Sequence, residues 1–216
     1  RPVGPFRLLE VVGSGGMGEV FRAVTEDGRE VALKTIHPHL AKIKQFVERF
    51  HREAKLLEKL AHPHVVKVLE SGQLTDDGEE RHYIAMEFVH GRKLSEILRA
   101  EAPDEEMTLD VMVKRGQMGI IVPDEAVIKI LRQVCGVLDA AHDMGVVHRD
   151  IKPDNIIVTD PAWNVKLIDF GIARDTAELH TFVSQTGQML GTPAYMSPEQ
   201  CEGKKDIDVR SDIYSL

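Results

Sequence analysis

The segment VVHRDIKPDNIIV, residues 146–158, brings together side chains that could transfer a phosphoryl group. Asp150 and Asn155 stand five residues apart with Lys152 between them, and Asp169 opens the sequence Asp-Phe-Gly after an apolar run. Phosphoryl transfer depends mainly on positioning and on neutralising charge, and Mg²⁺ prefers oxygen ligands. We therefore expect Asp150 to orient the attacking hydroxyl and accept its proton while Lys152 steadies the phosphate. Asn155 and Asp169 would hold Mg²⁺.

A glycine-rich segment near the start of the chain could bind phosphates. Residues 13–18 read Gly-Ser-Gly-Gly-Met-Gly and match the pattern G-x-G-x-x-G, which is weak when it stands alone. A dinucleotide site needs a helix after the glycines and an acidic residue about twenty positions later. Residues 19–21 continue instead as a strand. We expect a strand–turn–strand flap whose bare N–H groups approach phosphates; a plain glycine-rich hairpin is the alternative.

Lys34 ends the apolar sequence Val-Ala-Leu-Lys and lies inside a predicted strand. A buried ammonium is costly unless it is paired. Glu53 is the expected partner, because it lies in the middle of the next predicted helix, beside its apolar stripe. Such a pair would leave the ammonium able to hold two phosphates. In the alternative, Lys34 extends to solvent along its apolar stem and Glu53 lies on the surface.

Length, charge and cysteine content limit the classes of protein. The 216 residues suffice for one large domain or two lobes. The net charge of −8 argues against a nucleic-acid-binding protein, which usually carries a basic face. No apolar run in this chain reaches the length of a membrane-spanning helix. Cys135 and Cys201 lie far apart in no metal-binding spacing, which favours a reducing compartment and a cytoplasmic location; a membrane anchor beyond residue 216 stays open.

The first 91 residues are predicted to form five strands and one helix. Alternating and β-branched segments predict strands at residues 6–12, 19–24, 30–36, 65–69 and 82–89, with a polar connection at 75–81. Apolar residues recur at spacings of three and four on one helix, which a proline at 63 ends. They are Ile43, Val47, Phe50, Ala54, Leu57 and Ala61.

The remaining residues, 92–216, are predicted to be mainly helical. A short helix is expected at 94–99, and a longer one at 123–144 that Gly145 ends. The expected buried stripe of the longer helix consists of Val127, Leu131, Val134, Leu138 and Ala141. A short strand is expected at 165–168, a polar loop at 175–190, and an insertion without clear periodicity at 101–122.

Taken together, these motifs resemble those of the eukaryotic-type protein kinases, and in particular of the bacterial serine/threonine kinases. In the order and spacing of the family, residues 6–216 carry GSGGMGEV, VALK, Glu53, YIAMEFV, VVHRDIKPDN, IDFG, GTPAYMSPEQ and SDIYSL. The resemblance implies an α+β bilobed fold: a five-stranded antiparallel N-lobe with one helix over residues 1–91, and a mainly helical C-lobe over 92–216. ATP would lie between the lobes with two Mg²⁺ ions, for which Mn²⁺ could substitute.

The resemblance also assigns a nucleotide site. The phosphates would lie against Gly13, Ser14, Gly15, Gly16, Met17 and Gly18. The adenine would be sandwiched by Val12, Val20, Ala32 and Ile157. Glu87 and Val89 would hydrogen-bond its edge through their backbones, behind Met86 as the gatekeeper.

Substrate class and regulation follow from the same resemblance. Lys152 and the sequence GTPAYMSPE are typical of serine/threonine kinases, and Thr192 would contact the catalytic loop at Asp150 and Lys152. Arg149 beside the catalytic Asp is typical of kinases controlled by a phosphate on the activation loop, residues 172–190. Ser184 and Thr186 are the expected autophosphorylation sites; plain solvent-facing polarity is the alternative. The expected partners are protein substrates and a second copy of the chain.

Internal packing should link the two lobes. A stacked apolar column is expected from Leu57, Val68, His148 and Phe170. Asp212 is expected to tie the base of this column to the catalytic loop.

Two departures from the family pattern carry expectations. Ser197-Pro-Glu199 replaces the more familiar Ala-Pro-Glu, and the sequence stops just after Asp212, before the arginine that normally pairs with Glu199. We therefore expect a piece of a longer protein with a partial C-lobe. The alternative function is an ATP-binding pseudokinase or scaffold made inactive by the missing helices; a small-molecule kinase is less well supported because such enzymes generally lack the Ser-Pro-Glu segment.

Overall fold

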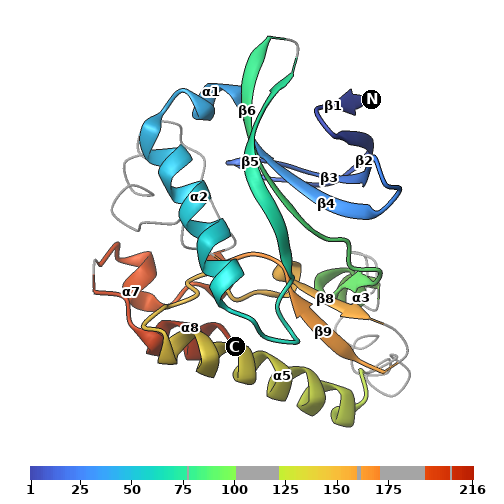
Figure 1. Ribbon diagram of the computed structural model, residues 1–216. Helices are drawn as coiled ribbons and strands as arrows, with labels where there is room; N and C mark the ends of the chain where they lie inside the picture. Colours follow the sequence, from blue (N-terminus) through green and yellow to red (C-terminus); the bar gives the residue numbers. More distant parts are fainter. Residues whose placement is uncertain (77, 101–121, 160–161, 171–192, 205) are drawn as a thin grey trace, which may run out of the picture.

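A curled antiparallel sheet forms most of the first lobe. In the computed structural model, described here for residues 1–216 except 77, 101–121, 160–161, 171–192 and 205, its six strands run in the order β1-β2-β3-β4-β6-β5 (Figure 1). Every neighbouring pair in the sheet is antiparallel. The strands are β1 (Pro2–Val3), β2 (Phe6–Ser14), β3 (Gly18–Thr25), β4 (Glu30–Ile36), β5 (Val68–Asp76) and β6 (Glu79–Glu87).

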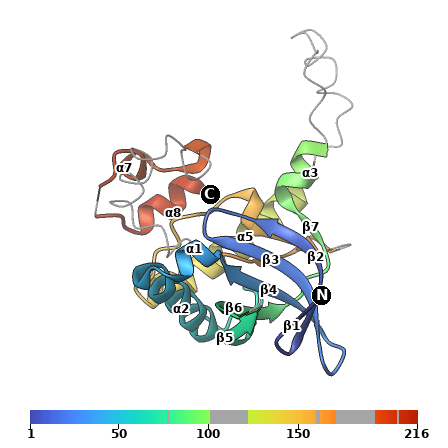
Figure 2. The ribbon, with the colours of Figure 1, turned by 90° about the horizontal axis from the view of Figure 1, so that it is seen from above.

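Two helices, α1 (Pro38–Ala41) and α2 (Lys44–Lys59), follow β4 and lie beside the β5–β6 end of this sheet (Figures 1 and 2). The middle of the predicted apolar stripe sets the orientation of α2, because Phe50, Ala54 and Leu57 are buried. The two ends of the stripe were predicted wrongly, because Ile43 and Ala61 lie outside the helix and are exposed. Glu53 is buried on the same face as Ala54 and Leu57. The helix therefore brings one carboxylate into the interior of the lobe.

The sequence predicted five strands and one helix for this lobe, and the structure adds the two-residue edge strand β1 and the single turn α1. The fourth predicted strand was placed too early, because β5 begins at Val68 rather than at residue 65. The predicted polar connection at 75–81 lies largely within β5 and β6, which pair up to Asp76 and Glu79. Side-chain polarity does not interrupt an exposed antiparallel hairpin, since the polar residues can face water.

Residues 64–66 instead join the two lobes. Val65 forms a parallel bridge with Leu167. The Val66 N–H donates to the Leu167 carbonyl at 2.8 Å, and the Leu167 N–H donates to the His64 carbonyl at 2.8 Å. A ring nitrogen of His64 also lies 3.0 Å from the Val165 carbonyl. The segment that follows α2 is therefore hydrogen-bonded to the strand that leads to Asp169.

The second lobe combines helices with a small three-stranded sheet of order β7-β8-β9 (Figure 1). In the described part of this lobe, turns of 3-10 helix lie at Pro153–Asn155 and Pro193–Tyr195. The other elements are β7 (Arg92–Lys93), α3 (Leu94–Ala100), α5 (Asp124–Asp143), β8 (Ile156–Thr159), β9 (Asn164–Leu167), α7 (Pro198–Cys201) and α8 (Val209–Ser215). Helix α5 packs against β9. No helix among the described residues has both the length and the apolar character needed to cross a membrane.

Helix α5 has the predicted extent, but part of its predicted buried stripe was wrong. Val134, Leu138 and Ala141 are buried, whereas Val127 and Leu131 are 40% and 38% exposed. At its N-terminal end the buried positions are Ala126 and Ile130. Apolar residues occupy neighbouring positions over 126–131, so two stripes of equal period were available and periodicity could not choose between them. Gly145, with φ of 71°, ends the helix region as predicted.

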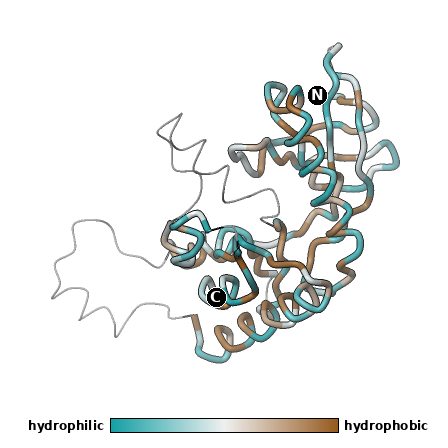
Figure 3. The backbone as a smooth tube through the Cα atoms, turned by 90° about the vertical axis from the view of Figure 1, so that its left-hand side faces the viewer, coloured by the Kyte–Doolittle hydropathy of each residue, from teal (hydrophilic) through white to brown (hydrophobic). Residues whose placement is uncertain are grey.

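The main hydrophobic core runs through both lobes. One cluster of buried residues includes Leu57, Val68 and Met86 from the first lobe together with Leu138 and Phe170 from the second. Figure 3 shows apolar and polar residues interspersed through both lobes, the first above and the second below. A smaller cluster, built on Phe6, Ala23, Val31, Leu33 and Ala85, lies within the first lobe. A shared core holds the two lobes in register around the residues between them.

Candidate active site

Lys34, Glu53 and Asp169 meet between the two lobes. The Nζ atom of Lys34 lies 2.7 Å from Glu53 Oε1 and 2.9 Å from Asp169 Oδ1. Lys34 comes from β4, Glu53 from α2, and Asp169 follows β9. The Lys34 side chain is 15% exposed and that of Glu53 is 2% exposed. The predicted Lys34–Glu53 pair is confirmed, and the alternative in which Glu53 lies on the surface is wrong.

The shared ammonium sets the charges of this cluster. Burial disfavours the charge on Lys34, but the carboxylates of Asp169 and Glu53 outweigh it and raise the pKa of Lys34 above its usual value. Burial raises the pKa of Glu53 above its ordinary value, and the negative charge of Asp169 adds to this effect while Lys34 opposes it. Burial acts in the same sense on Asp169, but the Lys34 ammonium prevails and holds the pKa of that carboxyl well below its usual range. Asp169 is therefore the stronger acid of the two carboxyl groups.

The glycine-rich segment forms the predicted turn between two strands. Gly13 pairs with Val20 across β2 and β3, and Gly15 and Gly18 exchange backbone hydrogen bonds of 2.9 and 3.3 Å. A Cβ atom on Gly18 would lie 1.7 Å from the Thr35 carbonyl oxygen, so only glycine fits there. The flap is thus fixed by close approach to β4.

His37, the residue that follows β4, supports this flap. This role was not predicted from the sequence. Its ring Nε2 atom lies 3.0 Å from the Gly15 carbonyl, and its backbone N–H donates to the Met17 carbonyl at 3.0 Å. The two contacts hold the flap on both sides of Gly16. A contact of a side chain with a distant carbonyl leaves no periodic signal, so no pattern could have indicated it.

The catalytic loop brings Asp150, Lys152 and Asn155 together. The Asn155 side-chain Nδ2 donates to Asp150 Oδ2 at 2.9 Å and to the Asp150 carbonyl at 2.8 Å. Lys152 Nζ lies 3.3 Å from Asp150 Oδ2. Because both side-chain hydrogen bonds of Asn155 use its amide nitrogen, its amide oxygen points away from Asp150. The backbone N–H of Ile168 donates to the Asn155 carbonyl at 3.1 Å. This hydrogen bond places the two predicted metal ligands, Asn155 and Asp169, on adjacent backbone segments.

Asp212 supports the backbone of the catalytic loop, as the sequence predicted. Its carboxylate is fully buried and accepts hydrogen bonds of 2.8 Å from the N–H groups of His148 and Arg149. A ring nitrogen of His142 lies 2.8 Å from the same carboxylate. Arg149 has φ of 67°, a left-handed conformation that non-glycine residues seldom adopt. The carboxylate thus stabilises a strained residue immediately before Asp150.

The predicted column between the lobes has the expected members. The rings of His148 and Phe170 lie 4.3 Å apart, and both residues are buried. Leu57 and Val68 are buried in the same core cluster as Phe170. Burial lowers the pKa of His148, so this imidazole is neutral at pH 7. Phe170 is buried in the core, and the adjacent Asp169 side chain contacts Lys34.

The predicted gatekeeper and adenine residues lie along the strands that line the space between the lobes. Ala32 on β4 pairs with Met86 on β6, and Ile157 lies on β8 opposite Lys93. The backbone N–H of Glu87 donates to the Lys67 carbonyl at 2.9 Å, so any adenine contact at Glu87 must use its carbonyl. Its side chain accepts from Lys166 Nζ at 2.6 Å, a contact between lobes that sequence reasoning missed. Adenine binding by Val12, Val20, Ala32, Ile157 and Val89 stays a prediction.

The predicted regulatory residues divide into two groups. Arg149 belongs to the described catalytic loop. Ser184, Thr186 and Thr192 lie outside the described residues, as do residues 101–121 of the insertion predicted at 101–122. The Ser-Pro-Glu segment begins α7, where Ser197 caps the helix and Ser211 donates a hydrogen bond to Glu199.

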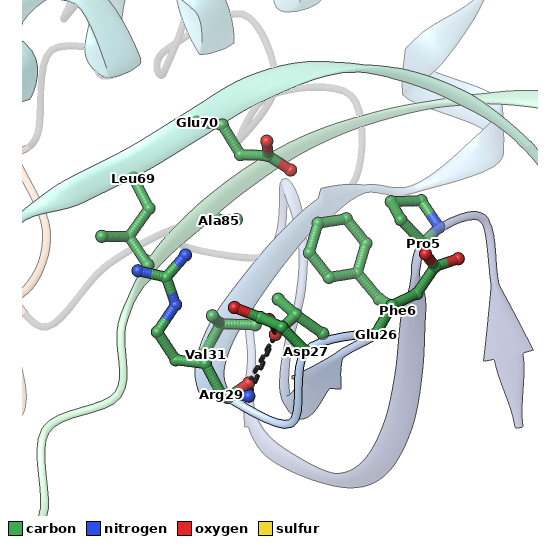
Figure 4. A pocket seen from close by; sticks show the side chains of 10 residues that line it. Pro5, Phe6, Glu26, Asp27, Arg29, Val31, Leu69, Glu70 and Ala85 are labelled. Carbon is green, nitrogen blue, oxygen red and sulfur yellow. Dashed lines mark hydrogen bonds between the residues drawn. The ribbon is translucent and has the colours of Figure 1, made fainter.

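A separate hollow lies on the smaller hydrophobic cluster of the first lobe. It has a volume of about 300 Å³, with Phe6, Val31, Leu69 and Ala85 among its apolar walls. Figure 4 shows acidic and basic side chains, including Arg29, at its rim. None of the residues that line it is a predicted site residue. The hollow is therefore separate from the residues that cluster around Lys34.

Comparison with known proteins places this site in a family. Residues 6–216 match the family described as the protein kinase domain. The chain is 43% identical over 211 residues to the probable serine/threonine-protein kinase PknB of Corynebacterium glutamicum, covering 97% of this chain and 30% of that protein. It is 41% identical over 214 residues to the serine/threonine-protein kinase PksC of Streptomyces coelicolor, covering 99% of this chain and 36% of that protein. The chain thus spans about a third of the length of these relatives.

A solved structure agrees with the sequence comparison. The kinase domain of Mycobacterium tuberculosis PknI superposes with a TM-score of 0.67 at 28% identity, over 99% of this chain and 69% of that one. The bilobed fold and the order of the motifs are those predicted from the sequence. The chain therefore belongs to the protein kinase family, alongside the serine/threonine kinases of bacteria.

Proposed function

We propose that this chain is the catalytic region of an enzyme that transfers the γ-phosphoryl group of ATP to serine and threonine hydroxyls of proteins. The observation that carries the proposal is the position of Lys34 Nζ, 2.7 Å from Glu53 and 2.9 Å from Asp169. One cation, held by an acid from each lobe, is suited to binding phosphates between them. A surface lysine would not be held in this way.

The residues present fit Mg²⁺, with Mn²⁺ as a substitute. Asn155 offers an amide oxygen turned away from Asp150, and the Asp169 side chain is 41% exposed with one oxygen paired to Lys34. A carboxylate and an amide oxygen are hard ligands of the kind that Mg²⁺ prefers. Bound there, the metal would neutralise the charge on the phosphate oxygens during transfer.

Each of the remaining polar residues has a part in the proposed transfer. Lys34 binds phosphate oxygens with its ammonium, and the glycine-rich turn covers them with backbone N–H groups. Asp150 orients the substrate hydroxyl and accepts its proton, and its orientation is set by the hydrogen bond from Asn155. Lys152, 3.3 Å from Asp150, stabilises the phosphate as it moves.

Nucleotide specificity and regulation belong to the same proposal. The adenine lies among Val12, Val20, Ala32 and Ile157, with backbone contacts at Glu87 and Val89 and with Met86 behind it. Arg149 binds a phosphate on Ser184 or Thr186, because guanidinium groups pair with phosphate bidentately. Thr192 belongs to the same regulatory part of the proposal, with a role at the catalytic loop during transfer. Two copies of the chain meet transiently when one phosphorylates the other, and the two free cysteines suit a cytoplasmic site of action.

Intact-mass spectrometry after incubation with Mg-ATP tests the proposal. We expect mass gains in steps of one phosphate, and transfer to a generic protein substrate. Asp150→Asn should reduce the rate by roughly 10²- to 10⁴-fold, because it removes the proton acceptor. Asp139→Asn, an exposed change on α5, is the matched control and should leave the rate unaltered. ATP binding without any mass gain would support the pseudokinase alternative, and mapping that finds neither Ser184 nor Thr186 modified would reject the regulatory part.

A further inference from the structure

Gln200 bridges the start of helix α7 and the catalytic loop. Its side-chain oxygen accepts a hydrogen bond from the Ser197 N–H at 3.0 Å, and its own N–H donates to the Ser197 hydroxyl at 3.4 Å. These two contacts form a capping box. The amide Nε2 of the same side chain donates to the Arg149 carbonyl at 2.8 Å, across 51 positions of sequence. One side chain therefore both closes α7 and reaches the residue before Asp150.

The contact falls on a residue whose backbone needs support. Arg149 has φ of 67°, and its N–H is held by the buried Asp212 carboxylate of α8 at 2.8 Å. Its carbonyl is held by Gln200 of α7. That carbonyl belongs to the peptide group that joins Arg149 to Asp150. Because the peptide group is planar, a hydrogen bond that fixes this carbonyl also limits the directions in which the Asp150 side chain can point.

Helices α7 and α8 are themselves joined, so the two supports form one unit. The Ser197 hydroxyl donates to the Ser211 hydroxyl at 3.0 Å, and both serines are fully buried. Ser211 immediately precedes Asp212. Gln200, which donates to the Arg149 carbonyl, and Asp212, which accepts from the Arg149 N–H, therefore lie on two helices that a buried hydrogen bond holds together.

We propose that Gln200 is a positioning residue for the transfer step, which holds the Arg149–Asp150 peptide so that Asp150 faces the substrate hydroxyl. It acts through Asp150 and does not touch substrate or nucleotide. Its kinetic effect rests on the proposed kinase activity. A small misplacement of a reacting group is enough to slow a reaction by up to roughly a hundredfold.

Two substitutions separate positioning from helix capping. Gln200→Glu keeps an oxygen that can accept from the Ser197 N–H but removes the donor to Arg149, whereas Gln200→Met removes both. We expect both variants to lower kcat by roughly 10- to 100-fold while KM for ATP stays unaltered. Glu202→Gln, at the exposed end of the same helix, is the matched control and should keep the wild-type kcat. If Gln200 only caps α7, Gln200→Glu will match the wild type and only Gln200→Met will be less stable.

Hydrogen exchange of the backbone amides gives a readout that does not depend on activity. We expect the amides of Arg149 and Asp150 to exchange faster in Gln200→Glu than in the wild type, with the melting temperature unaltered. Should the wild type bind Mg-ATP yet transfer no phosphate, the proposed function fails while the exchange comparison still decides the role of Gln200. A Gln200→Glu variant with wild-type kcat and wild-type exchange at these amides would overturn the inference.

Discussion

The Nζ atom of Lys34 lies 2.7 Å from Oε1 of Glu53, although the two residues are 19 positions apart and belong to different elements. The contact exists only while α2 is docked against the sheet. Glu53 is 1% exposed, so its carboxylate has little water with which to replace the lysine. The position of the helix and the charge of the phosphate site are therefore coupled.

Removing the charge of Glu53 should weaken this coupling. A charge-assisted hydrogen bond contributes about 1.5–3 kcal/mol, so Glu53→Gln is expected to lower kcat/KM for ATP by roughly 10- to 100-fold. Steady-state kinetics with varied ATP would measure the change. Glu58→Gln, an exposed substitution on the same helix, is the control. Equal kinetics for the two variants would show that the pair does not matter for nucleotide use.

The pH dependence of the reaction should report the same carboxylate. The pKa of Glu53 is raised above its ordinary value of 4.5, mainly by burial, and only the ionised form completes the ion pair. As pH falls through the raised pKa, the pair is lost, so kcat/KM for ATP should decline at pH values well above 4.5. In Glu53→Gln this acid limb should disappear. An unaltered limb in that variant would assign it to another group.

Loss of Asp212 should destabilise the fold as well as the catalytic loop. Asp212→Ala leaves the N–H groups of His148 and Arg149 without their acceptor in a fully buried place. Each such donor left without an acceptor costs about 1–3 kcal/mol, so the free energy of unfolding should fall by roughly 2–6 kcal/mol. Urea denaturation would measure this, with the exposed Asp206→Ala as control. A loss equal to that of the control would mean that water or a rearranged loop satisfies the two groups.

His37 should affect the binding of ATP more than the rate of transfer. His37→Ala removes the ring contact with the Gly15 carbonyl, a hydrogen bond that contributes about 0.5–1.5 kcal/mol. KM for ATP should rise by roughly 2- to 10-fold at constant kcat, because the flap covers the phosphates without donating a reacting group. His37→Gln, which keeps a donor, should recover part of the loss, and the exposed Lys42→Ala should have no effect. A fall in kcat alone would contradict this account.

The grouping of the candidate site residues could be predicted from the sequence because several of them lie close together in the chain. Asp150 and Asn155 lie within one turn-like segment, and the apolar period of α2 is by itself enough to place Glu53 beside a buried face. The exposed Val127 shows the limit of the same reasoning: where apolar residues crowd neighbouring helical positions, the period does not select the buried face. The neighbours decide it, and here they include β9.

The contacts that sequence reasoning missed share a physical cause. Gln200 reaches a carbonyl 51 positions away, His37 one that is 22 positions away, and Lys166 a carboxylate 79 positions away. In the sequence alone, each of these side chains is indistinguishable from an ordinary polar residue on the protein surface. Only the folded backbone brings each side chain within about 3 Å of its partner.

The bridge between Val65 and Leu167 acts mechanically as a fulcrum. It fixes the chain just after α2 to the strand just before Asp169, with hydrogen bonds of 2.8 Å on both sides of the contact. Because this contact joins the two lobes, we expect any opening between them to pivot here, which would leave the carboxylate of Asp169, two residues beyond Leu167, almost in place. In the proposed kinase, nucleotide exchange would then require movement of the glycine-rich flap and not of Asp169.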